Sequence, residues 1–168
     1  RAKIIIDLST TGPGTETQLA ERLARGGVCL LDCPISGGPP KAREGTLSLM
    51  VSGDPDAVAK VRPLLNVFGS VFVVSDRPGA SQVLKLLNNL LSFTALVASS
   101  EVLALGRKCG LDMDAMLAVI NASSGRNSAT LEKFPRNIVT GGYDFGGAVA
   151  IAKKDTMLCL EHAKAMGV

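Results

Sequence analysis

The stretch Val28-Cys29-Leu30-Leu31-Asp32-Cys33-Pro34-Ile35-Ser36-Gly37-Gly38 decides the fold class. It opens with the apolar run of a buried strand and closes with turn-forming residues. Ligands of α/β sheets bind beyond the carboxyl ends of strands, and adjacent glycines let backbone N–H groups approach an anion. Ser36, Gly37 and Gly38 are therefore candidates for binding a carboxylate, although an ordinary tight turn would have the same composition.

Similar strand patterns recur along the first half of the chain, separated by helical patterns. We expect strands at Lys3–Asp7, Val28–Asp32, Leu47–Ser52 and Val71–Val74, and helices at Thr15–Arg25 and from Asp54 to about Phe68. Asp54-Pro55 has the form of a helix cap followed by a first turn. Strands that alternate with helices in this way predict an α/β domain with a largely parallel sheet.

The strand pattern stops at Gly79, and the rest of the chain has helical patterns. We expect helices at Gln82–Cys109, Asp112–Ala122 and Ala148–Met166, so that residues 1–78 and 79–168 form two domains. The first of these helices is apolar on more than one face, and every apolar face must be covered. We expect a second copy to cover it in a homo-oligomer, a dimer or a tetramer. Cover by the α/β half and by further helices of the same chain is the alternative.

The composition argues against several classes of partner. The 168 residues include 18 Lys and Arg against 15 Asp and Glu, and a net charge of +3 is too small for binding driven by phosphate neutralisation. The most apolar stretch, Leu84–Leu105, holds Lys85, Asn88, Asn89 and Glu101, which a bilayer would bury at high cost. We therefore expect the core helix of a soluble protein, with neither nucleic acid nor membrane as a partner.

The four cysteines and the single histidine, His162, show no zinc-ligand spacing and no disulfide framework. We expect no metal site, and buried thiols in a reducing compartment. The apolar run Ile4–Ile6 is too short for a signal peptide. We expect a cytoplasmic protein, with the mitochondrion as the alternative compartment.

Three polar segments in the helical half are candidates for chemistry. Lys85, Asn89 and Ser92 fall at i, i+4 and i+7, so an amine, a carboxamide and a hydroxyl share one helix face. Leucines surround the amine, and desolvation would lower its pKa toward the range in which it exchanges protons near neutral pH. A lysine that reaches solvent along the helix is the alternative. The segment Asn121–Ser128 could contact a substrate, but a helix stop is the simpler interpretation. For Lys153–Asp155 alone, a solvated charge cluster is the simpler interpretation.

Taken in order, these segments resemble the β-hydroxyacid dehydrogenase family, which includes 3-hydroxyisobutyrate dehydrogenase, tartronate semialdehyde reductase and L-threonate dehydrogenase. The resemblance covers essentially the whole chain. Its pieces are Asp7–Thr10, Asp32–Gly38, Gly45–Leu47, Met50–Gly53, Gly79–Asn89, Ser123–Gly125 and Lys154-Asp155.

The resemblance implies the C-terminal part of a Rossmann-type sheet domain followed by an all-helical domain. It also implies that NAD or NADP oxidises a small 3-hydroxy acid resembling 3-hydroxyisobutyrate, glycerate or L-threonate, or that the reverse reduction occurs. Lys85 would be the catalytic acid/base, because oxidation of an alcohol leaves a proton that an amine can take. The other implied roles are substrate binding by Ser36, Gly37, Gly38, Asn89 and Ser123, and cofactor binding by Ser9, Thr10, Lys154 and Asp155.

The chain departs from the family at several points. Cys33 stands where alanine is commoner, and Ser81 stands at the second glycine of a Gly-x-Gly. No Gly-x-Gly-x-x-Gly follows a strand, so the pyrophosphate-binding half and the residue that selects NAD or NADP are missing. We expect an internal fragment that is inactive alone, with a helical domain incomplete at its C-terminus.

Two other functions remain open. A non-catalytic dimerisation or binding module of the same fold would have no need for an amine in an apolar helix. A relative of 6-phosphogluconate dehydrogenase would need a larger helical domain than this one.

Overall fold

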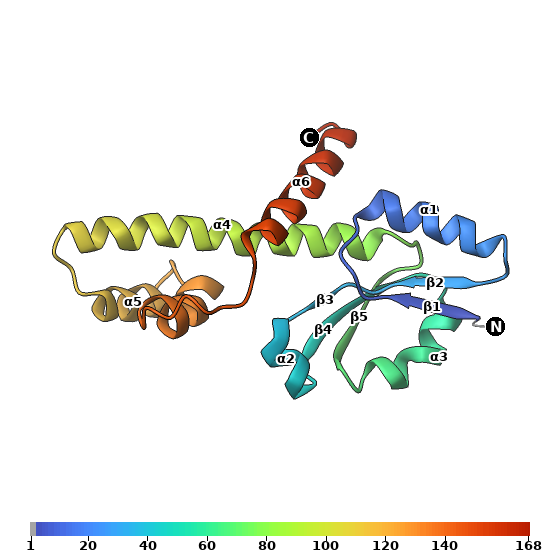
Figure 1. The fold of residues 1–168 in the computed structure, drawn as a ribbon, viewed down its shortest axis with the longest axis horizontal. Coiled ribbons are helices and arrows are strands. Elements are labelled where there is room, and N and C mark those ends of the chain that lie inside the picture. The colour runs from blue at the N-terminus through green and yellow to red at the C-terminus, as the bar shows by residue number, and fades with distance from the viewer. Residues whose placement is uncertain (1–2) are drawn as a thin grey trace. The chain divides into compact units, whose positions relative to one another are not determined.

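The computed structural model describes residues 3–168 and divides the chain into two compact units. The first consists of the residues up to Asn88 together with Asp155–Val168, and the second of Asn89–Lys154. The elements are β1 (Ile4–Asp7), α1 (Pro13–Ala24), β2 (Cys29–Asp32), β3 (Ile35–Ser36), α2 (Gly38–Glu44), β4 (Leu47–Ser52), α3 (Pro55–Leu65), β5 (Gly69–Ser75), α4 (Ala80–Lys108), α5 (Met113–Ala122), η1 (Ala129–Ile138) and α6 (Val149–Ala165) (Figure 1). Helices α4 and α6 each contribute to both units.

The sheet of the first unit confirms the α/β fold class and adds an antiparallel centre. Strand β1 pairs parallel with β2, and β4 pairs parallel with β5. Strand β4 connects these two parallel pairs, because it also runs antiparallel to β2 and β3. Asp32 lies opposite Ser52, and Ile35 lies opposite Leu49. These pairs share one register, so β2 and β3 behave as a single strand interrupted at Cys33-Pro34.

The antiparallel pairing follows from a short connection that the sequence patterns did not predict. Helix α2 has only seven residues, begins after Gly37 with a proline in its first turn, and ends at Gly45 in the left-handed conformation. A parallel neighbour needs a crossover of a dozen or more residues, whereas an antiparallel neighbour does not. The chain therefore reverses between Ser36 and Leu47.

Helices cover both faces of this sheet, with α1 on one face and α3 on the other (Figure 1). The apolar core lies between the sheet and α3, and it includes Leu31, Leu49, Val51, Val58 and Leu65. Helix α3 begins as its sequence predicts: the carboxylate of Asp54 accepts a hydrogen bond from the N–H of Ala57 at 2.8 Å, and Pro55 is the first helical residue.

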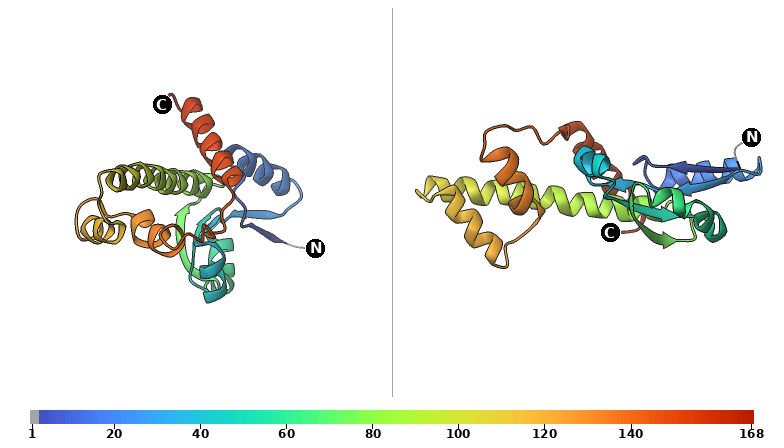
Figure 2. Two further views of the ribbon diagram at one scale, coloured as in Figure 1. Left: turned by 60° about the vertical axis from the view of Figure 1, so that its left-hand side comes forward. Right: turned by 90° about the horizontal axis from the view of Figure 1, so that it is seen from below.

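The second unit packs α5 and η1 against the C-terminal half of α4 (Figure 2). Its core is formed by Leu103, Leu117, Ala129 and Phe134. Asp112 caps α5 as predicted, accepting from the N–H of Ala115 at 2.9 Å. The ten-residue η1 is a π-helix with Pro135 inside it, and no sequence pattern predicted an element there. Long π-helices are rare, which is why periodicity does not find them.

Helix α4 is far more exposed than a core helix. Its length and composition would allow it to cross a membrane. Only 11% of its most apolar 18-residue window is buried, whereas a core helix is mostly buried. Leu91, Val97 and Leu105 are each more than half exposed. The expectation of a core helix is therefore wrong for this chain taken alone.

The cysteines divide by position. Cys33 and Cys159 are buried and Cys29 is partly buried, but Cys109 is exposed. The expectation of buried thiols is wrong for Cys109, which lies in the exposed turn directly after α4.

Candidate active site

Lys85 lies in the second turn of α4 with its side chain only 7% exposed. Burial lowers the pKa of its amine, and the charge of Asp155 opposes that shift. Asp155, on α6 in the same unit, is itself buried. The amine does not reach solvent along the helix, so the structure contains a desolvated lysine under the influence of a carboxylate, an arrangement suited to proton exchange.

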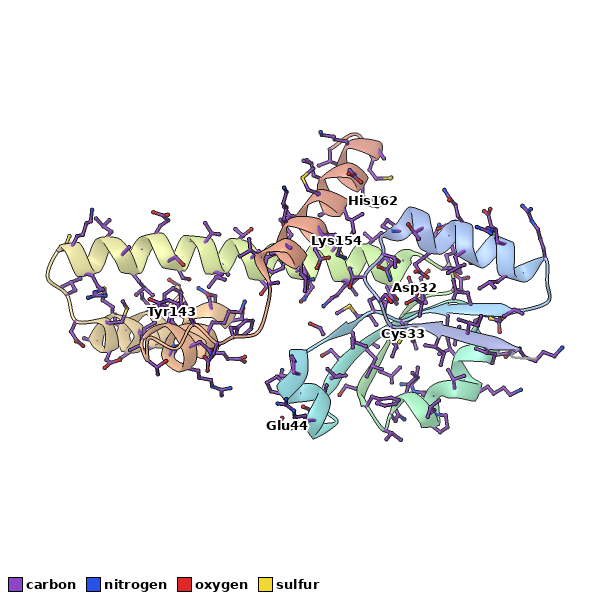
Figure 3. All side chains as sticks on the ribbon, in the orientation of Figure 1. Asp32, Cys33, Glu44, Tyr143, Lys154 and His162 are labelled. Atoms are coloured by element: carbon purple, nitrogen blue, oxygen red, sulfur yellow. The ribbon has the colours of Figure 1, made fainter. Side chains whose placement is uncertain are left out.

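The first turn of α4 is held by the buried carboxylate of Asp32, at the carboxyl end of β2 (Figure 3). One oxygen, Oδ2, accepts from the backbone N–H groups of Gly79 and Gln82 at 3.0 and 3.2 Å. The other, Oδ1, accepts from Nε2 of Gln82 at 2.7 Å. Burial raises the pKa of Asp32, and the hydrogen bonds from Gln82 and Gly79 oppose this.

The carboxamide of Gln82 joins α4 to the loop that follows β1. Its Oε1 accepts from the N–H groups of Thr11 at 3.0 Å and Gly12 at 3.1 Å. Its Nε2 donates to the carbonyl of Ser9 at 3.0 Å as well as to Asp32. No sequence pattern marked Gln82, and only its place one turn before Lys85 could have indicated it.

The two departures from the family have structural explanations. Ser81 is buried and its hydroxyl lies 2.6 Å from that of Ser52, at the end of β4, so the extra hydroxyl forms a hydrogen bond with the sheet. Cys33 is fully buried in the sheet core. Burial, together with the charge of Asp32, raises the pKa of the Cys33 thiol to about 12, so this thiol is a packing group and not a nucleophile.

Glu16 is a second buried carboxyl group near Asp32 that the sequence analysis missed. Thr11 Oγ1 donates to its Oε1 at 2.6 Å. Burial raises the pKa of Glu16, and the charges of Asp7 and Asp32 raise it further. On an amphipathic helix a glutamate is expected to face solvent, so no sequence signal marked it. Within residues 3–168, no three His, Cys, Asp or Glu side chains are arranged to hold a metal ion.

Ser36, Gly37 and Gly38 join β3 to α2. Gly37 has φ 137° and Gly38 has φ 68°, both in the region that favours glycine. A Cβ on Gly37 would lie 2.8 Å from Cβ of Lys41 and 3.1 Å from Cδ2 of Leu47. A side chain at Gly37 is therefore excluded by the local packing, whether or not a ligand binds there.

Ser9 and Thr10 follow β1 at its carboxyl end. The N–H of Ser9 donates to Oδ1 of Asp7 at 2.8 Å, while its carbonyl accepts from Gln82. Ser9 is exposed and Thr10 is half-buried. The loop is thus fixed through its backbone, and the Ser9 side chain remains accessible.

The second unit contains the remaining predicted residues. Asn89 is half-buried on α4, Ser123 is the exposed cap at the end of α5, and Lys154 is exposed on α6. The first unit thus brings together Lys85, Asp155 and, through Gln82, the loop with Ser9 and Thr10, and it also holds Ser36–Gly38. Asn89, Ser123 and Lys154 belong to the other unit.

The second unit also contains a half-buried amine that the sequence did not reveal. Lys133, on η1, donates from Nζ to Oγ of Ser92 at 2.9 Å and lies 5.2 Å from the ring centre of Phe145. Burial lowers its pKa. Ser92 was part of the predicted polar stripe, but its partner comes from an element that no pattern predicted.

Two family models match this chain. Residues 79–168 match the family described as NAD-binding of NADP-dependent 3-hydroxyisobutyrate dehydrogenase. Residues 1–75 match the NAD binding domain of 6-phosphogluconate dehydrogenase. The two matches together span both compact units.

Individual relatives are similar to this chain over nearly its whole length. The 3-hydroxyisobutyrate dehydrogenase of Pseudomonas aeruginosa is 39% identical over 97% of this chain and 57% of its own length. The 2-(hydroxymethyl)glutarate dehydrogenase of Eubacterium barkeri is 36% identical, over 96% and 54%. A solved structure of Psf3 in complex with NADP+ and 2-OPP has a TM-score of 0.86 and 35% identity, over 95% of this chain and 56% of that one.

This chain spans a little over half the length of these curated relatives. The matched family covers the whole of α4, including Lys85, and extends to the C-terminal end of α6. From that match and the shared fold, the chain belongs to the β-hydroxyacid dehydrogenase family.

Proposed function

We propose that this protein is an NAD(P)-dependent oxidoreductase that interconverts a small 3-hydroxy acid and its aldehyde or ketone, with Lys85 as the acid/base. The observation that carries the proposal is the buried Lys85 amine, whose pKa burial lowers and Asp155 partly restores. Family membership supplies the reaction class, and the amine supplies the group for the proton.

In the oxidation direction, neutral Lys85 takes the proton of the substrate hydroxyl. In the reduction direction, the charged amine returns that proton to the carbonyl oxygen. A bound nicotinamide supplies hydride exchange at the carbon. A buried amine suits this task because its pKa lies nearer to neutral pH than that of an exposed lysine. Asp155 keeps the pKa from falling too far.

On the substrate side, the proposal keeps the residue roles that the family resemblance implies. The backbone N–H groups at Ser36, Gly37 and Gly38 would bind the carboxylate, since two glycines allow an anion to approach the main chain. Asn89 and Ser123 would hold the rest of the substrate. The named substrates of the relatives, hydroxyisobutyrate and hydroxymethylglutarate, share a hydroxymethyl group on a carboxylic acid, and we propose that class here.

The cofactor side rests on Ser9, Thr10 and Lys154. Ser9 and Thr10 lie at the carboxyl end of a parallel strand, the edge at which α/β sheets bind dinucleotides, and their hydroxyls would donate hydrogen bonds to a bound NAD or NADP. The fit is partial, because these 168 residues contain no Gly-x-Gly-x-x-Gly for the pyrophosphate. Asp155, which the resemblance assigned to the cofactor, acts instead on Lys85 in this proposal.

Steady-state kinetics tests the assignment of Lys85. We would assay the protein encoded by the longest reading frame that contains this chain, with NAD and NADP against 3-hydroxyisobutyrate, glycerate and L-threonate. Lys85→Met and Lys85→Arg should lower kcat by about 10²- to 10⁴-fold, because neither side chain can exchange the proton. Calorimetric cofactor affinity should stay unchanged, as it should in Lys60→Met, which alters an exposed lysine of α3.

The outcomes separate the competing functions. Near-normal turnover of Lys85→Met would remove Lys85 from the mechanism. Turnover of 6-phosphogluconate in place of the small acids would favour the second enzyme class. Cofactor binding with no turnover of any of these acids would favour a binding module. The 168-residue chain alone should show neither tight NAD(P) binding nor turnover.

A further inference from the structure

The first turn of α4 is anchored along one row of the sheet edge. Asp7, Asp32 and Ser52 are register partners across β1, β2 and β4. Asp32 accepts from the backbone at Gly79 and Gln82, and Ser52 bonds to Ser81. Side-chain hydrogen bonds, all within the first unit, therefore set where α4 begins.

Gln82 uses the full hydrogen-bonding capacity of its carboxamide. The oxygen accepts from two loop N–H groups, at Thr11 and Gly12, and the nitrogen donates to the carbonyl of Ser9 and to Asp32. A carboxamide offers two donors and two acceptor sites, so each one is satisfied. Glutamate would lose both donors and leucine would lose all four interactions.

Asp32 determines which way this carboxamide faces. A carboxylate only accepts hydrogen bonds, so the NH₂ of Gln82 must turn toward Oδ1 and its oxygen must turn toward the loop. Both carboxylate oxygens are engaged, and hydrogen bonds to a charged acceptor are about twice as strong as neutral ones. Asp32 is fully buried, so water does not compete for it.

Gln82 thereby contacts the two parts of the unit that a hydride-transfer site must align. It precedes Lys85 by three residues, and residues at i and i+3 are neighbours on a helix surface. On its other side it holds the loop that carries Ser9 and Thr10. We propose that Gln82, oriented by Asp32, is a positioning residue that keeps the Ser9–Gly12 loop and the Lys85 turn of α4 at one fixed spacing. The inference rests on the proposed function.

A double-mutant cycle tests the pair in the protein encoded by the full reading frame. Gln82→Glu and Asp32→Asn should each lower kcat by about 10- to 100-fold, with the KM for the hydroxy acid nearly unchanged, because misalignment acts on the reacting geometry. The double substitution exchanges donor and acceptor: the introduced amide donates to the introduced carboxylate, which still accepts from Thr11 and Gly12. The hydrogen bond to the carbonyl of Ser9 stays lost, because a carboxylate has no donor, so part of the lost turnover should return. Gln18→Glu, on the exposed side of α1, is the matched control.

A second measurement does not depend on activity. In Gln82→Leu, amide hydrogen exchange at Thr11 and Gly12 should become faster, since both N–H groups lose their acceptor. The pH midpoint for acylation of the Lys85 amine, followed by mass spectrometry, should move upward as the turn loosens and the amine gains water. Asn66→Leu, at the exposed end of α3, should leave both unchanged.

Two results would overturn the inference. One is faster exchange at Thr11 and Gly12 with an unchanged Lys85 midpoint, which would make Gln82 a purely structural tie. The other is a double variant no more active than the worse single variant. Absence of any hydroxy-acid turnover would instead defeat the proposed function, and the Lys85 midpoint would still decide the positioning role. If Gln82→Leu does not fold, the pH midpoint for acylation of Lys85 is measured in Gln82→Glu and in the double variant instead. That comparison then decides whether Gln82 positions Lys85.

Discussion

Lys85 combines burial with a nearby carboxylate, and the two act on its proton in opposite directions. Burial disfavours the charged amine, whereas Asp155 favours it. The balance sets the pH at which the amine changes between acid and base. The pKa of Lys85 on α4 is therefore lowered mainly by burial, and Asp155 on α6 opposes part of that shift.

Asp155→Asn should move the pH profile of oxidation to lower pH. Loss of the carboxylate removes the influence that raises the Lys85 pKa, so the pKa falls. Oxidation needs the neutral amine, and its rate rises as pH passes through that pKa. The midpoint of kcat against pH should therefore shift downward, whereas Asp76→Asn, at an exposed site in the same unit, should not move it. An unchanged midpoint in Asp155→Asn would show that Asp155 does not influence the pKa of Lys85.

Glu16→Gln should stabilise the protein at neutral pH. The folded-state pKa of Glu16 lies above its usual 4.5, so the unfolded chain loses this proton first as pH rises. The contribution of Glu16 to stability is therefore complete below about pH 4.5 and is lost as pH rises through the folded-state pKa. Glutamine keeps an acceptor for Thr11 and carries no charge.

Urea unfolding of Glu16→Gln and wild type at pH 4 and pH 7 measures this difference. The gain in the free energy of unfolding should be present at pH 7 and should shrink at pH 4. Glu21→Gln, on the exposed face of α1, should unfold like wild type at both pH values. A gain of equal size at both pH values would mean that charge is not the cause.

At the scale of elements, α4 depends on the sheet edge for its start. Asp32 from β2 accepts hydrogen bonds from the N–H groups of Gly79 and Gln82, where the helix begins. Carboxylates stabilise helix N-termini because those N–H groups lack intrahelical partners. The tertiary fold thus does for α4 what Asp54 and Asp112 do locally for α3 and α5.

The Ser52–Ser81 pair should show measurable coupling. Ser81→Ala leaves the buried hydroxyl of Ser52 without its partner, which should cost about 1–3 kcal/mol in the free energy of unfolding. The double variant Ser52→Ala/Ser81→Ala removes both groups and should cost less than the two single changes together, with a coupling of about 0.5–1.5 kcal/mol. Strict additivity in denaturant unfolding would show that the 2.6 Å contact contributes nothing.

At the scale of the whole molecule, α4 has a large exposed apolar surface. Leu91, Val97, Val102 and Leu105 are each more than half exposed along this one helix. A helix apolar on several sides needs cover, and a self-complementary surface is the commonest way to provide it. We keep the expectation of a homo-oligomer on this ground.

Analytical ultracentrifugation of the protein encoded by the full reading frame tests the oligomer. The mass should be two or four times that of one chain at micromolar concentration, and Leu91→Glu should shift it toward the monomer. Leu64→Glu, at an exposed leucine of α3, is the control and should leave the mass unchanged. A wild-type monomer across the micromolar range would contradict the expectation and point to cover within one chain.

Local patterns in the sequence predicted most elements of this protein. The cap residues Asp54 and Asp112 marked the starts of their helices within one residue, although α3 ends at Leu65 and not near Phe68. Of the two interpretations of Lys85 that the sequence left open, burial supports the desolvated amine. Periodicity and capping depend on neighbours a few positions away, so they can be detected without a fold. The family could likewise be identified from the order of its motifs, because each motif is a short stretch that can be detected without a fold.

Only the tertiary structure decided the contacts that join distant segments. Gln82 meets Thr11 across 71 positions, and Asp32 meets Gly79 across 47. Apart from its place one turn before Lys85, nothing near Gln82 in the chain marks it, because its four partners come from a distant loop and a distant strand. The antiparallel centre of the sheet, the buried Glu16 and the effect of Asp155 on Lys85 have the same origin. Each depends on which chain segments are brought together when the apolar core is buried, and sequence periodicity carries no information about those pairings.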